Sequence, residues 1–185
     1  PFINVIERKP DDKNLSFGSS WLHQDTSYLA NDRPRYTMLM GIEIPKGQGN
    51  TIFSSGFNAY EKLPDEIKNK IKNATGIFSS AGPIAVTRLE REKEMGIKSS
   101  VSMEAEHPIV KRVNGKKTLY ISPGHLMKIK NVDEKDAAYL KKYLVEHVNK
   151  KEFIFSYEWS KGDVCLWDNL SILHMASEIK NCRRV

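Results

Sequence analysis

Apolar residues along the chain gather in short runs separated by turn-forming residues, which is the pattern of β-strands. The longest of these runs ends at Pro45, which has no N–H to give to a sheet. Gly47 and Gly49 then mark a turn before the next run. The pattern predicts strands at residues 36–44, 51–54, 153–159 and 164–167, the last of them buried.

A β-hairpin is predicted over residues 109–122. Its two strand-like runs, Ile109–Val113 and Lys117–Ser122, flank Asn114-Gly115, a pair that readily adopts the positive φ angles of a type I′ turn. Residues 79–106, by contrast, combine many charges with little periodicity. This stretch is therefore predicted to be a mobile surface segment or lid.

Two helices are predicted among these strands. Pro64 suits the first turn of a helix that would place on one face Ile67, Ile71 and Ala74. Asp133 suits the N-cap of a second helix, with an apolar face made of Ala137, Leu140, Leu144 and Val148. Two helices beside many short strands favour a mainly β fold with flanking helices, a jelly-roll-like sandwich.

One domain covering residues 1–185 is expected. The chain has 185 residues, 39% of them hydrophobic, which is enough for one core, and no repeat or low-complexity tract divides it. It begins at Pro1 and ends at Arg183-Arg184-Val185, a strand-like stretch that no turn-forming residue terminates. We therefore expect the domain to be incomplete at both ends.

The net charge of +6 does not favour a nucleic-acid partner, because of how the charges are arranged. Lysines alternate with Asp and Glu in 65–72, 88–98 and 133–151, which is typical of solvated faces. No apolar run is long enough to span a bilayer. Cys165 and Cys182 form no metal or disulfide motif, which favours reduced thiols and a cytoplasmic location. A small-molecule substrate is the expected partner, and homo-oligomerisation is left open.

His23 and Asp25 are the first candidate metal ligands. Residues two apart on an extended segment point to the same side, so an imidazole nitrogen and a carboxylate oxygen can approach one ion together. Such a pair often arises by chance, and a polar pair at a strand end is the alternative. His174, just after the predicted strand 164–167, could complete a set of two His and one carboxylate. This facial triad leaves coordination positions open for a co-substrate and dioxygen.

Arg183 and Arg184 follow this histidine at the end of the chain. A guanidinium binds a carboxylate through two parallel hydrogen bonds, which suits the far end of a 2-oxo acid that chelates the metal. A solvent-exposed basic pair is the alternative interpretation.

Taken together, these motifs resemble the taurine dioxygenase (TauD/TfdA) family of iron(II)- and 2-oxoglutarate-dependent dioxygenases. The resemblance extends from about Ser19 onward. It rests on the segments Trp21–Thr26, Gly49–Thr51, Glu106–Val110, Gly162–His174 and Arg183-Arg184.

The resemblance implies a double-stranded β-helix fold related to jelly rolls and cupins, with Fe(II), 2-oxoglutarate and dioxygen as cofactor and co-substrates. His23, Asp25 and His174 would hold the metal. Thr51 and Arg184 would bind the carboxylates of 2-oxoglutarate, and Arg183 is the alternative to Arg184 in this role. The reaction would hydroxylate a substrate and release succinate and CO2.

The substrate pocket implied by the resemblance includes Ser19, His125 and Trp167. Taurine-type members carry asparagine at the position of Ser19 and an aromatic substrate contact at that of His125, so taurine itself is not expected. The expected substrate is a small organic anion of the sulfonate, aryloxyacid or carboxylate type. A divalent-metal hydrolase and a non-catalytic ligand-binding β-sandwich are the alternatives.

Overall fold

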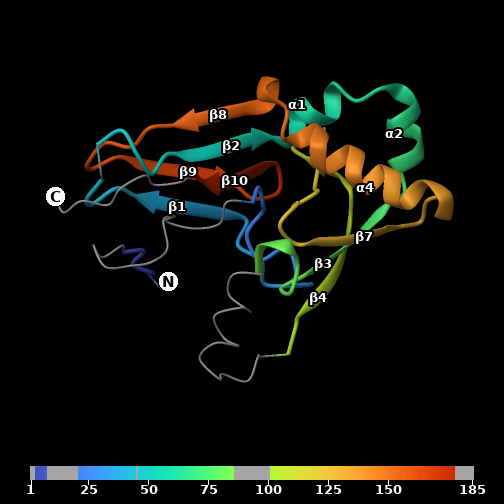
Figure 1. Ribbon diagram of the computed structural model, residues 1–185, viewed down its shortest axis with the longest axis horizontal. Coiled ribbons are helices and arrows are strands. Elements are labelled where there is room, and N and C mark those ends of the chain that lie inside the picture. The colour runs from blue at the N-terminus through green and yellow to red at the C-terminus, as the bar shows by residue number, and fades with distance from the viewer. Residues whose placement is uncertain (1–2, 8–20, 45, 86–100, 178–185) are drawn as a thin grey trace.

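The computed structural model describes residues 3–7, 21–44, 46–85 and 101–177. They form a mainly β molecule whose strands make two layers at one end and whose helices gather at the other (Figure 1). The predicted fold class is thereby confirmed.

The two layers at the strand-rich end are both antiparallel sheets. One consists of β1 (Tyr36–Met40) paired with β9 (Val164–Asp168). In the other, β2 (Thr51–Ser55) lies between β10 (Ile172–Ala176) and β8 (Ile154–Tyr157). The ring of Trp167 on β9 contacts Phe53 on β2 and His174 on β10, so this side chain joins the two layers.

The outer face of the β1–β9 sheet is apolar and exposed. Met38 pairs with Leu166 and Met40 with Val164, and all four side chains are more than half exposed. The prediction that residues 164–167 form a buried strand is therefore wrong for this face, because alternate residues of a strand point to opposite sides. Within β9, Trp167 alone is fully buried.

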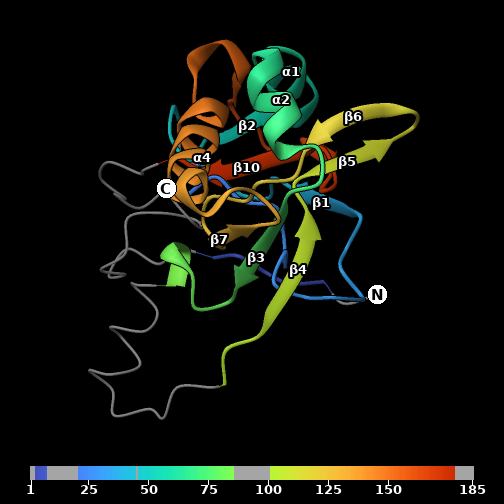
Figure 2. The same cartoon turned by 90° about the vertical axis from the view of Figure 1, so that its right-hand side faces the viewer.

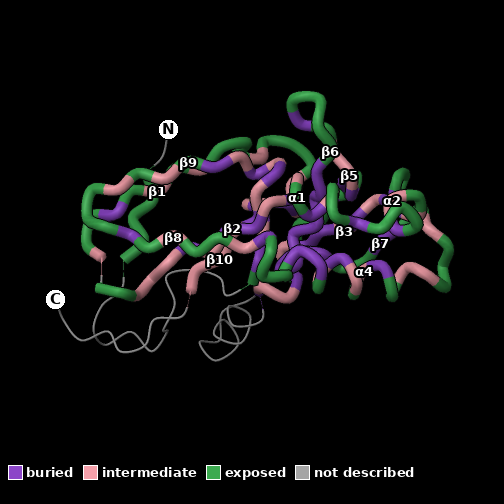
Figure 3. Tube along the Cα trace, turned by 90° about the horizontal axis from the view of Figure 1, so that it is seen from above, coloured by how far each residue is buried: buried purple, intermediate pink, exposed green. Residues whose placement is uncertain are grey.

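The other end of the molecule holds the core. A second three-stranded sheet places β3 (Thr75–Ser79) between β4 (Glu104–Pro108) and β7 (Leu126–Lys130). Three α-helices lie beside it: α1 (Gly56–Glu61), α2 (Asp65–Ile71) and α4 (Glu134–Val148). Two short 3-10 helices, η1 (Pro83–Ala85) and η2 (Lys151–Phe153), are the other helical elements of the described residues. Buried residues concentrate around these helices (Figure 3).

The predicted hairpin is present as β5 (Val110–Val113) and β6 (Lys116–Leu119), and it projects from the body of the molecule (Figure 2). Asn114 and Gly115 have φ angles of 50° and 79°, as a type I′ turn requires. Both predicted helices also form. However, Ala74 lies beyond the end of α2, and the Asp133 side chain makes no capping hydrogen bond to α4.

Part of the predicted 79–106 surface segment is ordered structure. Residues 104–106 begin β4, and η1 follows β3, so those two parts of the prediction are wrong. Residues 86–100 lie outside the described part of the chain. The run predicted as a strand to residue 44 pairs only as far as Met40. Within the described residues, no helix is long and apolar enough to cross a membrane.

Candidate metal centre

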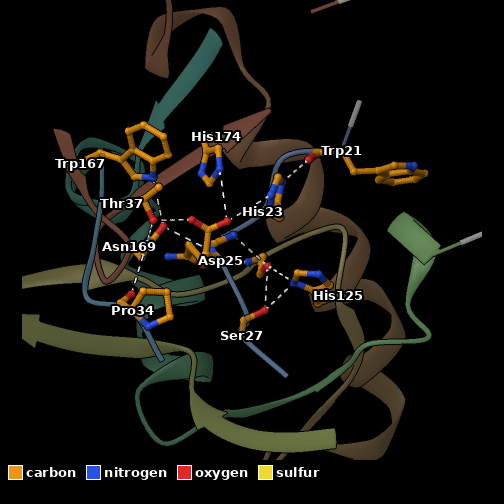
Figure 4. A network of polar contacts seen from close by, with 12 residues as sticks. Trp21, His23, Asp25, Ser27, Pro34, Thr37, His125, Trp167, Asn169 and His174 are labelled. Atoms are coloured by element: carbon orange, nitrogen blue, oxygen red, sulfur yellow. Dashed lines mark hydrogen bonds and ion pairs between the residues drawn. The ribbon is translucent and has the colours of Figure 1, made fainter. Parts of the chain in front are cut away.

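The chain brings His23, Asp25 and His174 together through one long-range backbone bridge (Figure 4). The N–H of His23 donates to the carbonyl of His174 at 3.0 Å, and the N–H of His174 donates back at 2.9 Å. Asp25 follows two residues later, where the chain enters a turn. An imidazole from β10 and an imidazole and a carboxylate from the segment before β1 therefore share one side of the bridge.

The ligand atoms of these three residues all lie within 4.8 Å of one another. Nε2 of His23 is 3.6 Å from Oδ1 of Asp25, and Nε2 of His174 is 3.5 Å from the same oxygen. Two imidazoles and one carboxylate are the donors of the facial triad that binds non-haem Fe(II). Among the described residues, no second group of three such side chains meets the same criterion. The site therefore fits the metal that the sequence suggested.

Both histidines favour the neutral form that binds metals. Burial lowers the pKa of His23, and burial together with the neighbouring His23 lowers the pKa of His174. Nδ1 of His23 lies 2.8 Å from the Trp21 carbonyl, so this nitrogen carries the proton and Nε2 keeps its lone pair. Nδ1 of His174 is buried and has no hydrogen-bond partner among the described residues.

The carboxylate of Asp25 is held from behind by a polar network. Thr37 donates its hydroxyl hydrogen to Oδ2 of Asp25 at 2.5 Å, which leaves Oδ1 facing the two imidazoles. Asn169 donates to the same Thr37 hydroxyl at 2.7 Å and to the Pro34 carbonyl at 3.2 Å. The Trp167 indole N–H donates to Oδ1 of Asn169 at 3.1 Å. Such outer contacts fix the orientation of a ligand and tune its metal affinity.

Thr37 and Asn169 were not assigned a role from the sequence. Asn169 lies inside the Gly162–His174 motif, and its place in that motif was the one available signal. Thr37 carries no signal of its own, because a threonine in a strand is common.

His125 lies beside the triad, with its ring centroid 5.8 Å from that of His23. Its Nδ1 is 2.8 Å from the Ser27 hydroxyl and 3.1 Å from that of Ser122. Burial, and next the nearby His23, lower the pKa of His125 to about 4, so the ring is neutral near pH 7. A Cβ at the preceding Gly124 would lie 3.1 Å from the Cβ of Ile84 and 3.3 Å from that of Trp21, so glycine lets these two residues pack closely against the backbone there.

Thr51 lies one strand away from the triad. It begins β2 opposite Ala176, two residues from the pair formed by Phe53 and His174. The Thr51 hydroxyl accepts a hydrogen bond of 2.9 Å from the Trp159 indole. Trp167 packs on His174 with 4.7 Å between ring centroids. Ser19, Arg183 and Arg184 lie outside the described residues.

A cavity of about 480 Å³ borders the triad on the side of Asp25. The loop before β1 supplies most of its wall, and Tyr120 and Asn169 supply further parts. A cavity of this size accommodates a small organic molecule.

The profile of the "Taurine catabolism dioxygenase TauD, TfdA family" matches residues 3–185, nearly the whole chain. The chain belongs to this family. An alkylsulfatase of Acinetobacter baylyi is 31% identical over 176 residues, which are 90% of this chain and 54% of that protein. An alpha-ketoglutarate-dependent sulfate ester dioxygenase of Pseudomonas putida is 28% identical, covering 85% of this chain and 54% of that protein.

Solved structures of TauD-type dioxygenases share the fold. A taurine dioxygenase from Burkholderia xenovorans superposes with a TM-score of 0.68 at 26% identity, over 85% of this chain and 51% of that one. The structure of AAD-2 with Mn(II) and N-oxalylglycine gives a TM-score of 0.71 at 25% identity, over 88% of this chain and 59% of that one. The TauD-like jelly-roll prediction is confirmed. The chain spans about half the length of the curated relatives it matches.

Proposed function

We propose that this TauD-family chain carries the metal centre of an Fe(II)- and 2-oxoglutarate-dependent dioxygenase that hydroxylates a small anionic organic molecule. The observation that carries the proposal is the convergence of His23, Asp25 and His174 on one point. Iron bound there would supply the oxidising chemistry, together with dioxygen and 2-oxoglutarate, and succinate and CO2 would be released. A cytoplasmic location and the absence of a nucleic-acid partner belong to this proposal.

The three ligands have separate tasks before any chemistry begins. The two neutral imidazoles would offer Nε2, and Oδ1 of Asp25 would supply the one negative charge. Because the network of Thr37 and Asn169 fixes the carboxylate, little freedom is lost when a metal binds. The remaining side of the ion would stay open for the co-substrate.

The 2-oxoglutarate site of this proposal uses Thr51 and Arg184, with Arg183 as the alternative arginine. Thr51 lies on the strand next to that of His174, which is compatible with a ligand reaching from the metal to this hydroxyl. A guanidinium would hold the distal carboxylate through two hydrogen bonds. The assignment of the arginines rests on the family resemblance alone.

The proposed substrate is a sulfate ester, sulfonate or aryloxyacid. Relatives are named for sulfate esters, for sulfonates and for 2,4-dichlorophenoxyacetate, all of which are anions. The rings of His125 and Trp167 lie next to His23 and His174 respectively, which places them near the proposed reaction centre. Together with Ser19, they are the proposed substrate-facing residues.

Succinate release tests the proposal. The purified protein is incubated with Fe(II), 2-oxoglutarate, oxygen and a panel of alkyl sulfates, sulfonates and aryloxyacids, and succinate and the oxidised product are measured. Succinate should form only when Fe(II) is present, and His174→Ala should abolish it while circular dichroism remains unchanged. Cleavage of a substrate by water, with neither succinate nor an oxidised product formed, would instead identify a metal-dependent hydrolase. Full activity of His174→Ala would refute the proposed metal centre.

A further inference from the structure

Two neighbouring cations, one of them on the wall of the cavity beside the triad, have no carboxylate partner among the described residues. Arg33, in the loop before β1, and Lys111, on β5, are both half-buried. Among the described residues, no Asp or Glu lies within ion-pair distance of either. Buried charges are normally paired, so an uncompensated pair of cations indicates a place for an anion.

Arg33 is held rigidly but is not saturated. Its Nη1 donates to the carbonyls of Leu29 and Ala30, each at 2.8 Å, and lies against the ring of His107. Its Nε is buried with no hydrogen-bond partner in the described part of the chain. The guanidinium is therefore fixed in place with donor capacity left over.

The neighbours of Arg33 do not neutralise it. Nζ of Lys111 lies 3.5 Å from the ring centroid of Tyr120. Burial and then Arg33 lower the pKa of Lys111 to about 7, and burial, Lys111 and Arg33 lower that of His107 to about 4. His107 is thus neutral at pH 7, and the positive charge rests on Arg33 and, in part, on Lys111.

Arg33 and Tyr120 both line the cavity that borders Asp25. The Tyr120 hydroxyl has no hydrogen-bond partner among the described residues. Burial raises the pKa of Tyr120 to about 12, so the hydroxyl keeps its proton and can donate it. It is therefore an unused donor on the same cavity wall as an unsaturated guanidinium.

The other charged groups of the cavity wall do not cancel this arrangement. Arg35 is already paired with Asp168, at 3.3 Å between Nε and Oδ2. The carboxylate of Asp25 is directed toward the triad and Thr37, where a bound metal would neutralise it. Asp32 lines the cavity as an exposed side chain and is screened by solvent.

We infer that this cavity binds an oxyanion of the sulfate or carboxylate type, which accepts hydrogen bonds from the Arg33 guanidinium and the Tyr120 hydroxyl. Lys111 strengthens the binding through its charge and holds the Tyr120 ring in place. Where the anion is the head group of the oxidised substrate, the inference rests on the proposed function. Where it is a free inorganic anion, the site stands independently.

Calorimetric titration with sodium sulfate, at constant ionic strength and pH 7, tests the site without any enzymatic turnover. Tyr120→Phe keeps the ring under Lys111 and removes only the hydroxyl, so it should weaken sulfate binding about three- to tenfold. Arg33→Gln should weaken it about tenfold or more, since a charged donor is lost. Lys117→Met is the control for the loss of a positive charge away from the cavity. Lys117 also lies over a tyrosine ring, that of Tyr60, and its variant should bind sulfate like the parent.

Sulfate that does not bind the parent protein, or that binds Tyr120→Phe and Arg33→Gln as tightly as the parent, would overturn the inference. Arg33→Gln removes contacts that hold the loop before β1. If that variant does not fold, the sulfate affinity of Tyr120→Phe alone decides the test. A competition arm then identifies the source of the anion. Sulfate that raises the KM of an alkyl sulfate in the succinate assay marks the substrate head-group site, and sulfate without effect on that KM marks a separate anion site. A protein without oxygenase activity would contradict the proposed function, while the calorimetric result would still stand.

Discussion

The Thr37 hydroxyl donates a 2.5 Å hydrogen bond to Oδ2 of Asp25, so that Oδ1 alone faces His23 and His174. This contact sets which oxygen of the carboxylate is available to a metal. It also joins β1 to the ligand-bearing segment that precedes it, because Thr37 is the second residue of that strand.

Replacing Thr37 with valine keeps the shape of the side chain and removes this hydrogen bond. We expect the affinity for Fe(II) or Mn(II) to fall about 10- to 100-fold, as for other changes to groups that orient a ligand. Thr37→Ser should retain most of the affinity. Thr75→Val, which removes a hydroxyl that accepts from Asn131, is the control. Equal metal affinity in Thr37→Val and the parent would show that the contact does not orient Asp25.

Asn169 is expected to matter for stability as well as for the metal. It is buried, it accepts from the Trp167 indole, and it donates to Thr37 and Pro34. Asn169→Ala should lower the free energy of unfolding by about 2–4 kcal/mol, because several buried partners lose their hydrogen bonds. Urea denaturation measures this. The control Asn149→Ala removes an exposed contact to Val145 at the end of α4 and should cost under about 1 kcal/mol.

Thr51 allows its structural and ligand-binding contributions to be separated. Its hydroxyl accepts from the Trp159 indole, so Thr51→Val should cost about 1–3 kcal/mol of stability by leaving a buried N–H unpaired. If Thr51 also binds 2-oxoglutarate, Thr51→Val should raise the Kd of that ligand. Trp159→Phe removes the same hydrogen bond from the other side and should leave the Kd nearly unchanged. An equal rise of the Kd in both variants would assign Thr51 a structural task only.

The pKa of Lys111 predicts a pH dependence of stability. In the folded chain burial lowers this pKa to about 7, whereas in the unfolded chain it is 10.5. Between these values the unfolded state binds more protons, so the free energy of unfolding should rise with pH through this window. Lys111→Met should show a smaller rise than the parent from pH 7 to 10, and Lys117→Met the same rise as the parent. Identical curves for Lys111→Met and the parent would contradict the lowered pKa.

The features that the sequence predicted well are those fixed by local interactions. The hairpin follows from Asn114-Gly115, whose φ angles suit a type I′ turn whatever surrounds it. The helix α4 follows from an apolar face repeated over about three turns, which places Leu140, Leu144 and Val148 in the core.

The elements that were missed lack such a signal. The helix α1 has six residues, too few for periodicity to be visible, and Ser55 caps it. The strand β4 alternates exposed Glu104 and Glu106 with buried Ala105 and His107, so its buried side is not consistently apolar. Its place in the sheet depends on pairing with β3, which is a long-range interaction.

The ligands of the candidate metal site were predictable from the sequence, but the residues that orient those ligands through hydrogen bonds were not. Spacing suggested that His23 and Asp25 approach one ion, and the structure adds that a bridge to His174 brings the third ligand to them. The hydrogen bonds of Thr37 connect residues far apart in the sequence, and no pattern along the chain encodes them.

Metal titration under anaerobic conditions tests the central claim most directly. Fe(II) is added to the purified protein with 2-oxoglutarate present, and binding is followed by calorimetry and by the visible charge-transfer absorption of a 2-oxo acid chelated to Fe(II). The parent protein should bind one Fe(II) per chain and develop this absorption, and His174→Ala and Asp25→Ala should lose both. One Fe(II) bound with unchanged affinity and absorption in either variant would contradict the assignment of His23, Asp25 and His174 as the metal centre.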